Sequence, residues 1–172
     1  MTSRESDGSS AFSFSRTALE RLPASAEFVG QWSEDRHRAT LASQDARYYV
    51  SDDDSGEAVA SVTKHLRAFA ILRGLAETSR AIELKRLVVH PPGQGLGRRI
   101  LGELIQIAFE ELQAHRLFLD VFDDNARARH LYLSLGFVEE GLLREAALRE
   151  GEFCSLRLMS LLDREYAVRR EK

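Results

Sequence analysis

The stretch VVHPPGQGLGRR, residues 88–99, places glycines at 93, 95 and 97 between an apolar run and a helix-like pattern. A helix N-terminus exposes unpaired N–H groups and a partial positive charge, and glycine lets an anion approach the backbone closely. The stretch therefore predicts a strand-to-helix junction whose amides surround a phosphate or pyrophosphate, with Arg98 and Arg99 nearby. A glycine turn that only starts a helix is the alternative left open.

Two familiar phosphate-binding motifs are excluded at this junction. The P-loop requires Lys followed by Ser or Thr after its last glycine, whereas Gly97 is followed by Arg98 and Arg99. The dinucleotide-binding fingerprint is G-x-G-x-x-G, so a glycine must stand three residues after the second glycine. Here that position is Arg98 or Ile100. Nucleotide binding of either kind therefore loses its main support.

Composition bounds the class of protein. A chain of 172 residues with 44% hydrophobic residues and a formal net charge of -3 is typical of one globular domain without a basic nucleic-acid face. The single cysteine, Cys154, excludes an internal disulfide and favours the cytoplasm. We expect a disordered leader over residues 1–10, one domain over 11–172, and no membrane-spanning segment.

Apolar periodicity predicts strands alternating with helices. The helix that starts at Leu96 carries an apolar stripe facing a core. Asn125 is placed to cap the next helix and Gly136 to end it. The expected strands are 11–16, 46–51, 58–62, 68–72, 81–89, 115–122, 137–147 and 152–161, and a further helix is expected from Ala24 to about Ser43. This order indicates a mixed α/β sheet.

The segments ELKRLVVHPPGQGLGRRILGELI and FLDVFDDNARARHLYLSLGFVEEG together resemble the acyl-CoA-binding core of the GNAT N-acetyltransferase superfamily. The resemblance covers about residues 81–141. It implies a single-domain, mostly antiparallel sheet whose central parallel strands splay apart, flanked by helices. It also implies acetyl-CoA as co-substrate. The cofactor-binding residues that it implies are Leu87, Val88, Val89, Gly93, Gln94, Gly95, Leu96, Gly97, Arg98, Asn125, Arg129 and Tyr132.

One position departs from the family pattern. The Gln or Arg that the family has five residues before the last loop glycine is Pro92 here. Proline has no N–H and no charge, so one pyrophosphate contact must be lost or replaced by Gln94 or Arg98.

The resemblance also implies roles in catalysis. Glu83 matches the family's general base, which removes a proton from the acceptor ammonium. Backbone N–H groups near Val88 and Val89 would stabilise the oxyanion. Tyr132 would protonate the departing thiolate. The structural alternatives are a Glu83 paired with Lys85 or Arg86, and a Tyr132 that is simply a core residue.

Other chemistries are disfavoured. No second histidine or cysteine stands at metal-ligand spacing from His90, so we expect no metal. Cys154 alternates with apolar neighbours, which is typical of a small buried residue rather than a nucleophile.

The sequence does not identify the acceptor amine. The C-terminal segment from Glu139 to Leu162 resembles the branch of ribosomal-protein N-terminal and polyamine acetyltransferases. It allows a small-molecule amine or a peptide N-terminus as acceptor, and a homodimer. The alternative function is a non-catalytic acyl-CoA-binding or regulatory module, because a fold does not oblige chemistry.

Overall fold

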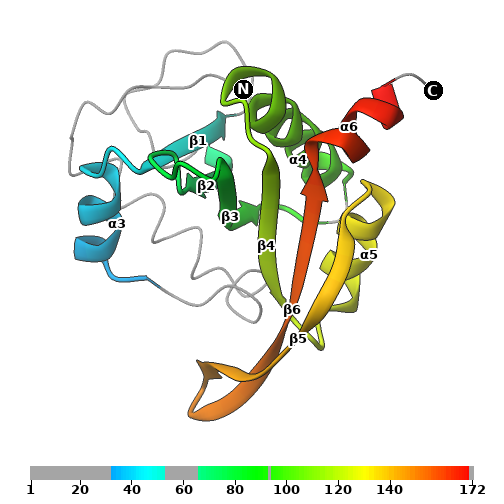
Figure 1. Ribbon diagram of the computed structural model, residues 1–172. Helices are drawn as coiled ribbons and strands as arrows, with labels where there is room; N and C mark the ends of the chain where they lie inside the picture. Colours follow the sequence, from blue (N-terminus) through cyan, green and yellow to red (C-terminus); the bar gives the residue numbers. More distant parts are fainter. Residues whose placement is uncertain (1–31, 53–65, 93, 171–172) are drawn as a thin grey trace.

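The computed structural model describes residues 32–52, 66–92 and 94–170 (Figure 1). The described chain forms one six-stranded sheet in the order β1-β2-β3-β4-β6-β5. Neighbouring strands are antiparallel except for the central pair, β3 and β4, which are parallel. The expected mixed, mostly antiparallel sheet is confirmed. The strands are β1 (Ala46–Asp52), β2 (Leu66–Arg73), β3 (Ala81–Val89), β4 (Arg116–Phe122), β5 (Val138–Arg149) and β6 (Glu152–Leu162), and the helices are α3 (Glu34–Leu41), α4 (Leu96–Gln106), the π-helix η1 (Ile107–Glu111), α5 (Ala126–Ser134) and α6 (Asp163–Arg170).

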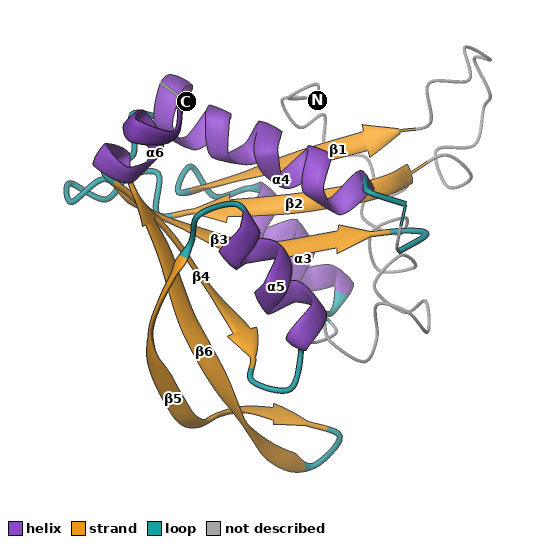
Figure 2. Cartoon of the chain, turned by 90° about the vertical axis from the view of Figure 1, so that its right-hand side faces the viewer, coloured by secondary structure: helices purple, strands orange, loops and turns teal. Residues whose placement is uncertain are grey.

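Helices cover both faces of the sheet. Figure 2 shows α4, α5 and α6 on one face and α3 on the other. The larger core lies under α4 and contains Leu104, Leu117 and Met159, none of them exposed. A smaller core under α3 contains Phe69 and Ile71. The parallel arrangement of β3 and β4 follows from the connection between them, because parallel neighbours need a crossover such as α4.

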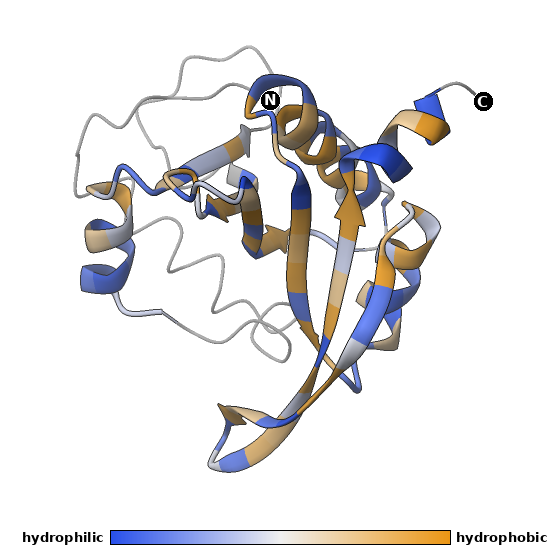
Figure 3. Ribbon diagram, in the orientation of Figure 1, coloured by the Kyte–Doolittle hydropathy of each residue, from blue (hydrophilic) through white to orange (hydrophobic). Residues whose placement is uncertain are grey.

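Helix α4 follows the predicted stripe. Its buried residues are spaced three and four apart, so one face packs on the sheet. Arg98 and Arg99 are exposed, and Figure 3 shows both hydrophobic and hydrophilic residues along the helical ribbons that cover the sheet. The helix then continues as one turn of π-helix that buries Phe109. The buried residues of α4 are Leu96, Ile100, Leu101, Leu104 and Ile105.

Helix α5 begins and ends at the predicted residues. The Asn125 side chain accepts a hydrogen bond from the Ala128 N–H at 3.0 Å, which satisfies one of the free amides of the first turn. After the helix, Gly136 has a φ of +96°, a left-handed conformation that favours glycine. Both expectations are confirmed, and they fix the ends of the segment that carries Tyr132.

The expected helix from Ala24 to about Ser43 is shorter in the described part of the chain. Trp32 and Ser33 are not helical, and α3 begins only at Glu34. The reason is local, since the Ser33 hydroxyl accepts a hydrogen bond from the Arg36 N–H at 3.3 Å and so caps the helix.

Several expectations lie wholly or partly outside the described residues. They are the leader over 1–10, the strands 11–16 and 58–62, the first part of the helix from Ala24, and Gly93.

The sequence analysis did not predict α6. This short helix packs through one aromatic residue, Tyr166, whose ring stacks on Phe109 with centroids 4.9 Å apart. The Tyr166 hydroxyl donates a hydrogen bond to Glu110 at 2.6 Å. An eight-residue helix without an apolar stripe gives little periodic signal, and its contacts are with residues distant in sequence.

Strands β5 and β6 form a long hairpin that extends beyond the rest of the sheet (Figures 1 and 2). The predicted REGE turn joins them, with positive φ at Glu150 and Gly151. Among the described helices, none combines the length and apolar composition needed to cross a membrane.

Candidate functional site

The two central strands separate shortly after they begin. Strands β3 and β4 pair in parallel only at Ala81–Arg116, Ile82–Leu117 and Glu83–Phe118. Beyond Glu83 no pairing between them is present, although both strands continue for several residues. The splayed parallel pair implied by the resemblance is therefore confirmed, and Glu83 lies at the point where the strands separate.

Strand β3 contains a bulge directly after Leu84. Leu72 of β2 pairs with Leu84, whereas the preceding residue, Ile71, pairs with Arg86. Lys85 is thus the extra residue of a β-bulge. The bulge turns the strand, so that Leu84 before it and Leu87 after it both pack on the core under α4.

The alternation of the β2–β3 ladder separates the two backbone amides suggested as oxyanion donors. The His90 N–H donates to the Arg67 carbonyl of β2 at 2.7 Å. Since alternate amides of a strand point to opposite sides, the Val88 N–H should face β2 and the Val89 N–H should face the gap between β3 and β4. Val89 is the better oriented donor.

The glycine-rich junction is an open helix N-terminus. Gly95 is the N-cap of α4 with a φ of +74°, and no side chain caps the helix. A Cβ placed on Gly95 would meet nothing within 4 Å, whereas one on Gly97 would lie 3.7 Å from Leu131. The first turn of α4 therefore presents its amides beside open space, which suits an anion.

Two side chains of the junction already have partners. Gln94 accepts a hydrogen bond from Arg67 at 3.1 Å. Arg98 donates to the hydroxyl of Ser134, the last residue of α5, at 2.6 Å. Either side chain would have to exchange that partner to reach a phosphate.

Glu83 is buried and held by two cations. Glu83 as a whole residue is 7% exposed to solvent. One carboxylate oxygen, Oε2, accepts from Arg73 Nε at 2.9 Å and from Nη2 at 2.5 Å. The other, Oε1, accepts from Lys85 Nζ at 2.9 Å. The suggested pairing with Lys85 is confirmed, and Arg73 is an additional partner that the sequence analysis did not identify.

Lys85 connects the two separating strands. Its Nζ lies 3.7 Å from the Asp120 carboxylate of β4 as well as 2.9 Å from Glu83. Asp120 is the one charged residue within the otherwise apolar part of β4, and its side chain is 36% exposed. A row of alternating charge thus runs from Arg73 through Glu83 and Lys85 to Asp120.

Tyr132 lies on the inner side of α5, against the core. Its ring meets Phe137 edge-on with centroids 5.7 Å apart. Burial, with a smaller contribution from the Asp120 carboxylate, raises the pKa of Tyr132 from 10.0 to about 12. The hydroxyl is therefore protonated at neutral pH, and it is a weaker acid than an ordinary tyrosine.

Asn125 caps α5 and Arg129 lies in its first turn, but the two side chains differ in how many of their polar atoms already have partners. The Asn125 Oδ1 is committed to the cap. Arg129 donates to Glu139 at 2.8 and 3.0 Å and to the backbone oxygen of Asp123. Arg129 is thus part of an ion-pair network that joins α5 to β5.

Several acidic residues at the start of α5 and on β5 are paired with arginines. Four carboxylates, from Asp123, Asp124, Glu139 and Glu140, contact Arg157, Arg149, Arg129 and Arg116. The side chains of Arg116 and Ser160 hold the pKa of Glu140 well below its usual range, at about 2. These pairs favour a structural role for the four carboxylates.

Cys154 lies on β6, its thiol 3.7 Å from the Glu152 carbonyl, and is only partly buried. Within the described ranges, no group of three or more His, Cys, Asp or Glu residues is arranged to hold a metal ion.

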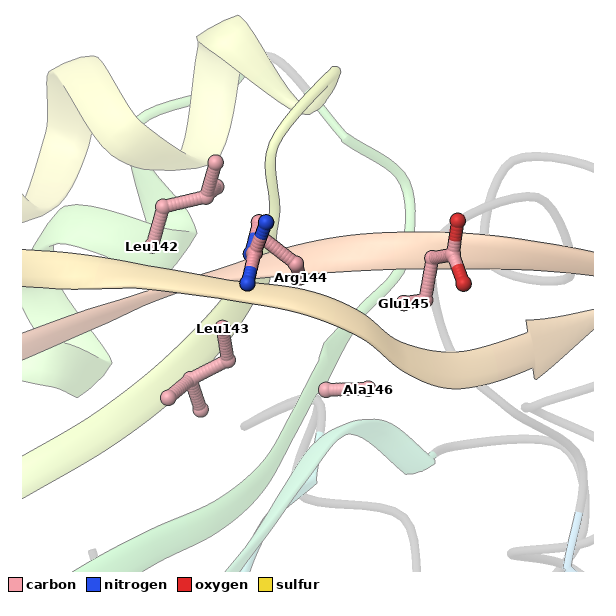
Figure 4. Close-up of a pocket in the computed structure, with 5 residues that line it drawn as sticks. All are labelled: Leu142, Leu143, Arg144, Glu145 and Ala146. Atoms are coloured by element: carbon pink, nitrogen blue, oxygen red, sulfur yellow. The ribbon is translucent and has the colours of Figure 1, made fainter.

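The surface formed by the described residues includes two hollows that bear on the site. One of about 430 Å³ contains Glu83, together with Asp45, Arg73, Glu77, Ser79 and Phe118. The other, of about 710 Å³, is lined by five consecutive residues of β5, from Leu142 to Ala146 (Figure 4). One strand alone cannot enclose a ligand, so the hollow at Glu83 is the candidate acceptor site.

The chain matches the model of the acetyltransferase (GNAT) family over residues 18–137. The match covers more than half of the chain, and the chain therefore belongs to the GNAT family. Enzymes of this family use acetyl-CoA as co-substrate.

Two curated relatives carry the names of N-acetyltransferases. The spermidine N(1)-acetyltransferase of Vibrio cholerae is 33% identical over 88 residues, which are 50% of this chain and 51% of that protein. The chain thus aligns with about half the length of that relative. The Bacillus subtilis protein YdaF, whose assignment as a ribosomal N-acetyltransferase is itself provisional, is 29% identical over 147 residues, 80% of either chain.

Solved structures share the fold. A mutant of the spermidine N-acetyltransferase SpeG from Vibrio cholerae superposes with a TM-score of 0.74 at 24% identity, covering 92% of this chain and 94% of that one. At this identity the likeness shows the fold alone.

Proposed function

We propose that this protein is an N-acetyltransferase that moves the acetyl group of acetyl-CoA to a primary amine by direct attack in a ternary complex. The observation that carries the proposal is the gap between β3 and β4 beyond Glu83, with the uncapped N-terminus of α4 following the same strand. A thioester in the gap would lie between a buried carboxylate and the α5 helix that carries Tyr132. Membership of the GNAT family supports this proposal.

The residues of the junction fit the cofactor. Amides of Leu96, Gly97 and Arg98 in the first turn of α4 would hold the pyrophosphate, since no side chain competes for them at the cap. Arg98 would supply the phosphate contact that is missing because Pro92 replaces the family's Gln or Arg. To do so, its guanidinium would exchange the Ser134 hydroxyl for a phosphate oxygen. Leu87 and Val89, on the β3 side of the gap, would line the acyl arm.

Of the two polar residues at the start of α5, Asn125 is the better candidate for the cofactor. Its amide NH₂ can donate while Oδ1 keeps the cap. Arg129 would have to give up its two hydrogen bonds to Glu139.

The mechanism assigns one task to each residue. Acetyl-CoA supplies an acyl carbon activated as a thioester. Glu83 takes a proton from the acceptor ammonium, directly or through water, and the neutral nitrogen attacks this carbon. The N–C bond forms, the nitrogen releases its second proton to solvent, the C–S bond breaks, and the Val89 N–H stabilises the negative charge that develops on the carbonyl oxygen.

Tyr132 acts on the leaving group as a hydrogen-bond donor. A thiol has a pKa of about 8.5, so full transfer from a phenol of pKa about 12 costs roughly 5 kcal/mol. A hydrogen bond from the Tyr132 hydroxyl stabilises the thiolate without that cost, and solvent supplies the proton once the product leaves.

The acceptor is a small cationic amine of the polyamine type. Three carboxylates, from Asp45, Glu77 and Glu83, line the hollow together with the single cation Arg73, and the hollow reaches Glu83 and Phe118, the last paired residues of β3 and β4. The carboxylates favour an acceptor with several positive charges over a neutral one. The spermidine acetyltransferase of Vibrio cholerae among the relatives supports this class.

The proposal includes a homodimer and a cytoplasmic location. Leu148 and Phe153 lie opposite each other near the tip of the β5–β6 hairpin and are 65% and 70% exposed. Such a pair favours a homodimer through this hairpin, which sedimentation of the purified protein would test. We place the reaction in the cytoplasm because the chain has a single cysteine.

The test is thiol release from acetyl-CoA with spermidine, propylamine or a short peptide with a free N-terminus. We expect spermidine to accelerate release most. Glu83→Gln should lower kcat by about 10² to 10⁴-fold, the usual effect of losing a general base, with coenzyme A binding retained. The matched control is Glu77→Gln in the same hollow, which should affect KM only. Tight coenzyme A binding without release for any amine would favour the non-catalytic module.

A further inference from the structure

The Lys85 ammonium lies between the carboxylates of Glu83 and Asp120, where β3 and β4 begin to separate. It is 2.9 Å from Glu83 and 3.7 Å from Asp120. The three side chains are 23%, 10% and 36% exposed, so the group is accessible but largely shielded. The charges alternate across two strands that share no backbone pairing at this level.

Strand alternation explains this position. Lys85 lies two residues after Glu83, so both side chains point to the same side of β3, before the bulge shifts the alternation at Arg86. Asp120 lies two residues beyond Phe118, the last β4 residue paired with β3. The ammonium therefore joins the strands where backbone hydrogen bonds no longer do.

Glu83 is also the residue proposed to receive the acceptor's proton, so the acceptor ammonium must approach the same carboxylate, either directly or with one water between them. Arg73 and Lys85 already supply three donors to its two oxygens. A carboxylate oxygen offers two lone pairs, and Oε1, which accepts from Lys85, is the less occupied of the two. An approaching ammonium at Oε1 meets Lys85.

We propose that Lys85 and a cationic acceptor compete for one position between the Glu83 and Asp120 carboxylates, which makes Lys85 a specificity-determining residue. The proposal rests on the proposed function for the nature of the acceptor. When the acceptor ammonium enters, Lys85 moves outward to solvent on its flexible stem. An acceptor without positive charge cannot displace it, so the ion pair selects for cations.

The test is calorimetric titration of the full chain with spermidine, which measures binding independently of turnover. Lys85→Met removes the competitor and should tighten binding roughly two- to fivefold, the range of a partly exposed ion pair. Lys85→Arg keeps a cation and should bind as the original chain does. Asp120→Asn should weaken binding, and Lys85→Met should then gain less in that background.

Arg73→Met is the matched control, because Arg73 also pairs with Glu83 but has no contact with Asp120 among the described ion pairs. Unchanged or weaker binding by Lys85→Met, or an equal gain in Arg73→Met, overturns the proposal. The second outcome would show general electrostatics rather than competition for one position. If the original chain acetylates no amine while these shifts in binding are found, the proposed activity fails and the competition stands.

Discussion

Gly95 offers a test that separates the needs of the fold from those of the ligand. Its φ of +74° lies in the left-handed region, where a side chain costs about 1–2 kcal/mol. The space around its missing Cβ is empty to 4 Å, so no packing would be lost or gained. Gly95→Ala should therefore destabilise the unliganded protein by about that amount, which corresponds to a fall in Tm of roughly 2–8 °C for a chain of this size.

The decisive variant is Gly95→Asn. Asparagine tolerates the left-handed region and can cap a helix, so this variant should be more stable than Gly95→Ala. Its side chain nevertheless extends into the open space in front of the first turn of α4. If that space holds the pyrophosphate, the Kd for coenzyme A should rise about tenfold or more, equivalent to about 1.4 kcal/mol.

Gly97→Ala is the control within the same loop. Its Cβ would lie 3.7 Å from a Leu131 methyl and 4.0 Å from a Val89 methyl, which are ordinary contacts. The substitution should be tolerated and should stabilise the helix by about 0.5–1 kcal/mol, the usual difference between Ala and Gly in a helix. Urea unfolding and calorimetric titration with coenzyme A measure both quantities. Coenzyme A binding by Gly95→Asn within twofold of the original chain would refute the assignment of this helix N-terminus to the pyrophosphate.

Two further predictions concern charge. The lowered pKa of Glu140, from 4.5 to about 2, stabilises the fold above pH 4.5, and this contribution is lost as pH falls toward 2. Because the side chain is one-third exposed, Glu140→Gln should cost only about 1 kcal/mol in urea unfolding at pH 7, with a smaller difference near pH 3. The raised pKa of Tyr132 stabilises the fold below pH 10, and this is lost as pH rises from 10 to about 12. Ultraviolet titration should show Tyr132, identified by its loss in Tyr132→Phe, ionising near 12; ionisation near 10 would contradict its burial.

Local signals in the sequence predicted the elements that carry the site. The alternation in AIELKRLVV predicted β3 with the observed ends, and Asn125 and Gly136 predicted the ends of α5. These signals are reliable because a cap or a left-handed glycine acts on residues within one turn of itself. Helix α6 gave no such signal, since it is held by contacts with η1, more than fifty residues earlier in the chain.

The partners of the candidate catalytic residues could not be predicted in the same way. Arg73 meets Glu83 because the two residues are directly opposite in the β2–β3 register. That register is set by the connection over residues 74–80, and it shifts at Lys85 farther along the strands; no local motif in the sequence predicts either feature. The raised pKa of Tyr132 likewise depends on how deeply α5 packs, whereas sequence alone supplied only the ordinary value of about 10.

The order of the elements from β3 to β6, the strand-to-helix junction at the glycines and the family resemblance could be predicted from the sequence. These features depend on short-range periodicity and on backbone preferences of single residues. The end of β3–β4 pairing at Glu83, and the gathering of Arg73, Lys85 and Asp120 around that point, appear only in the folded chain. Pairing, register and burial bring together residues far apart in the chain, and these distances set the charge environment in which the site would work.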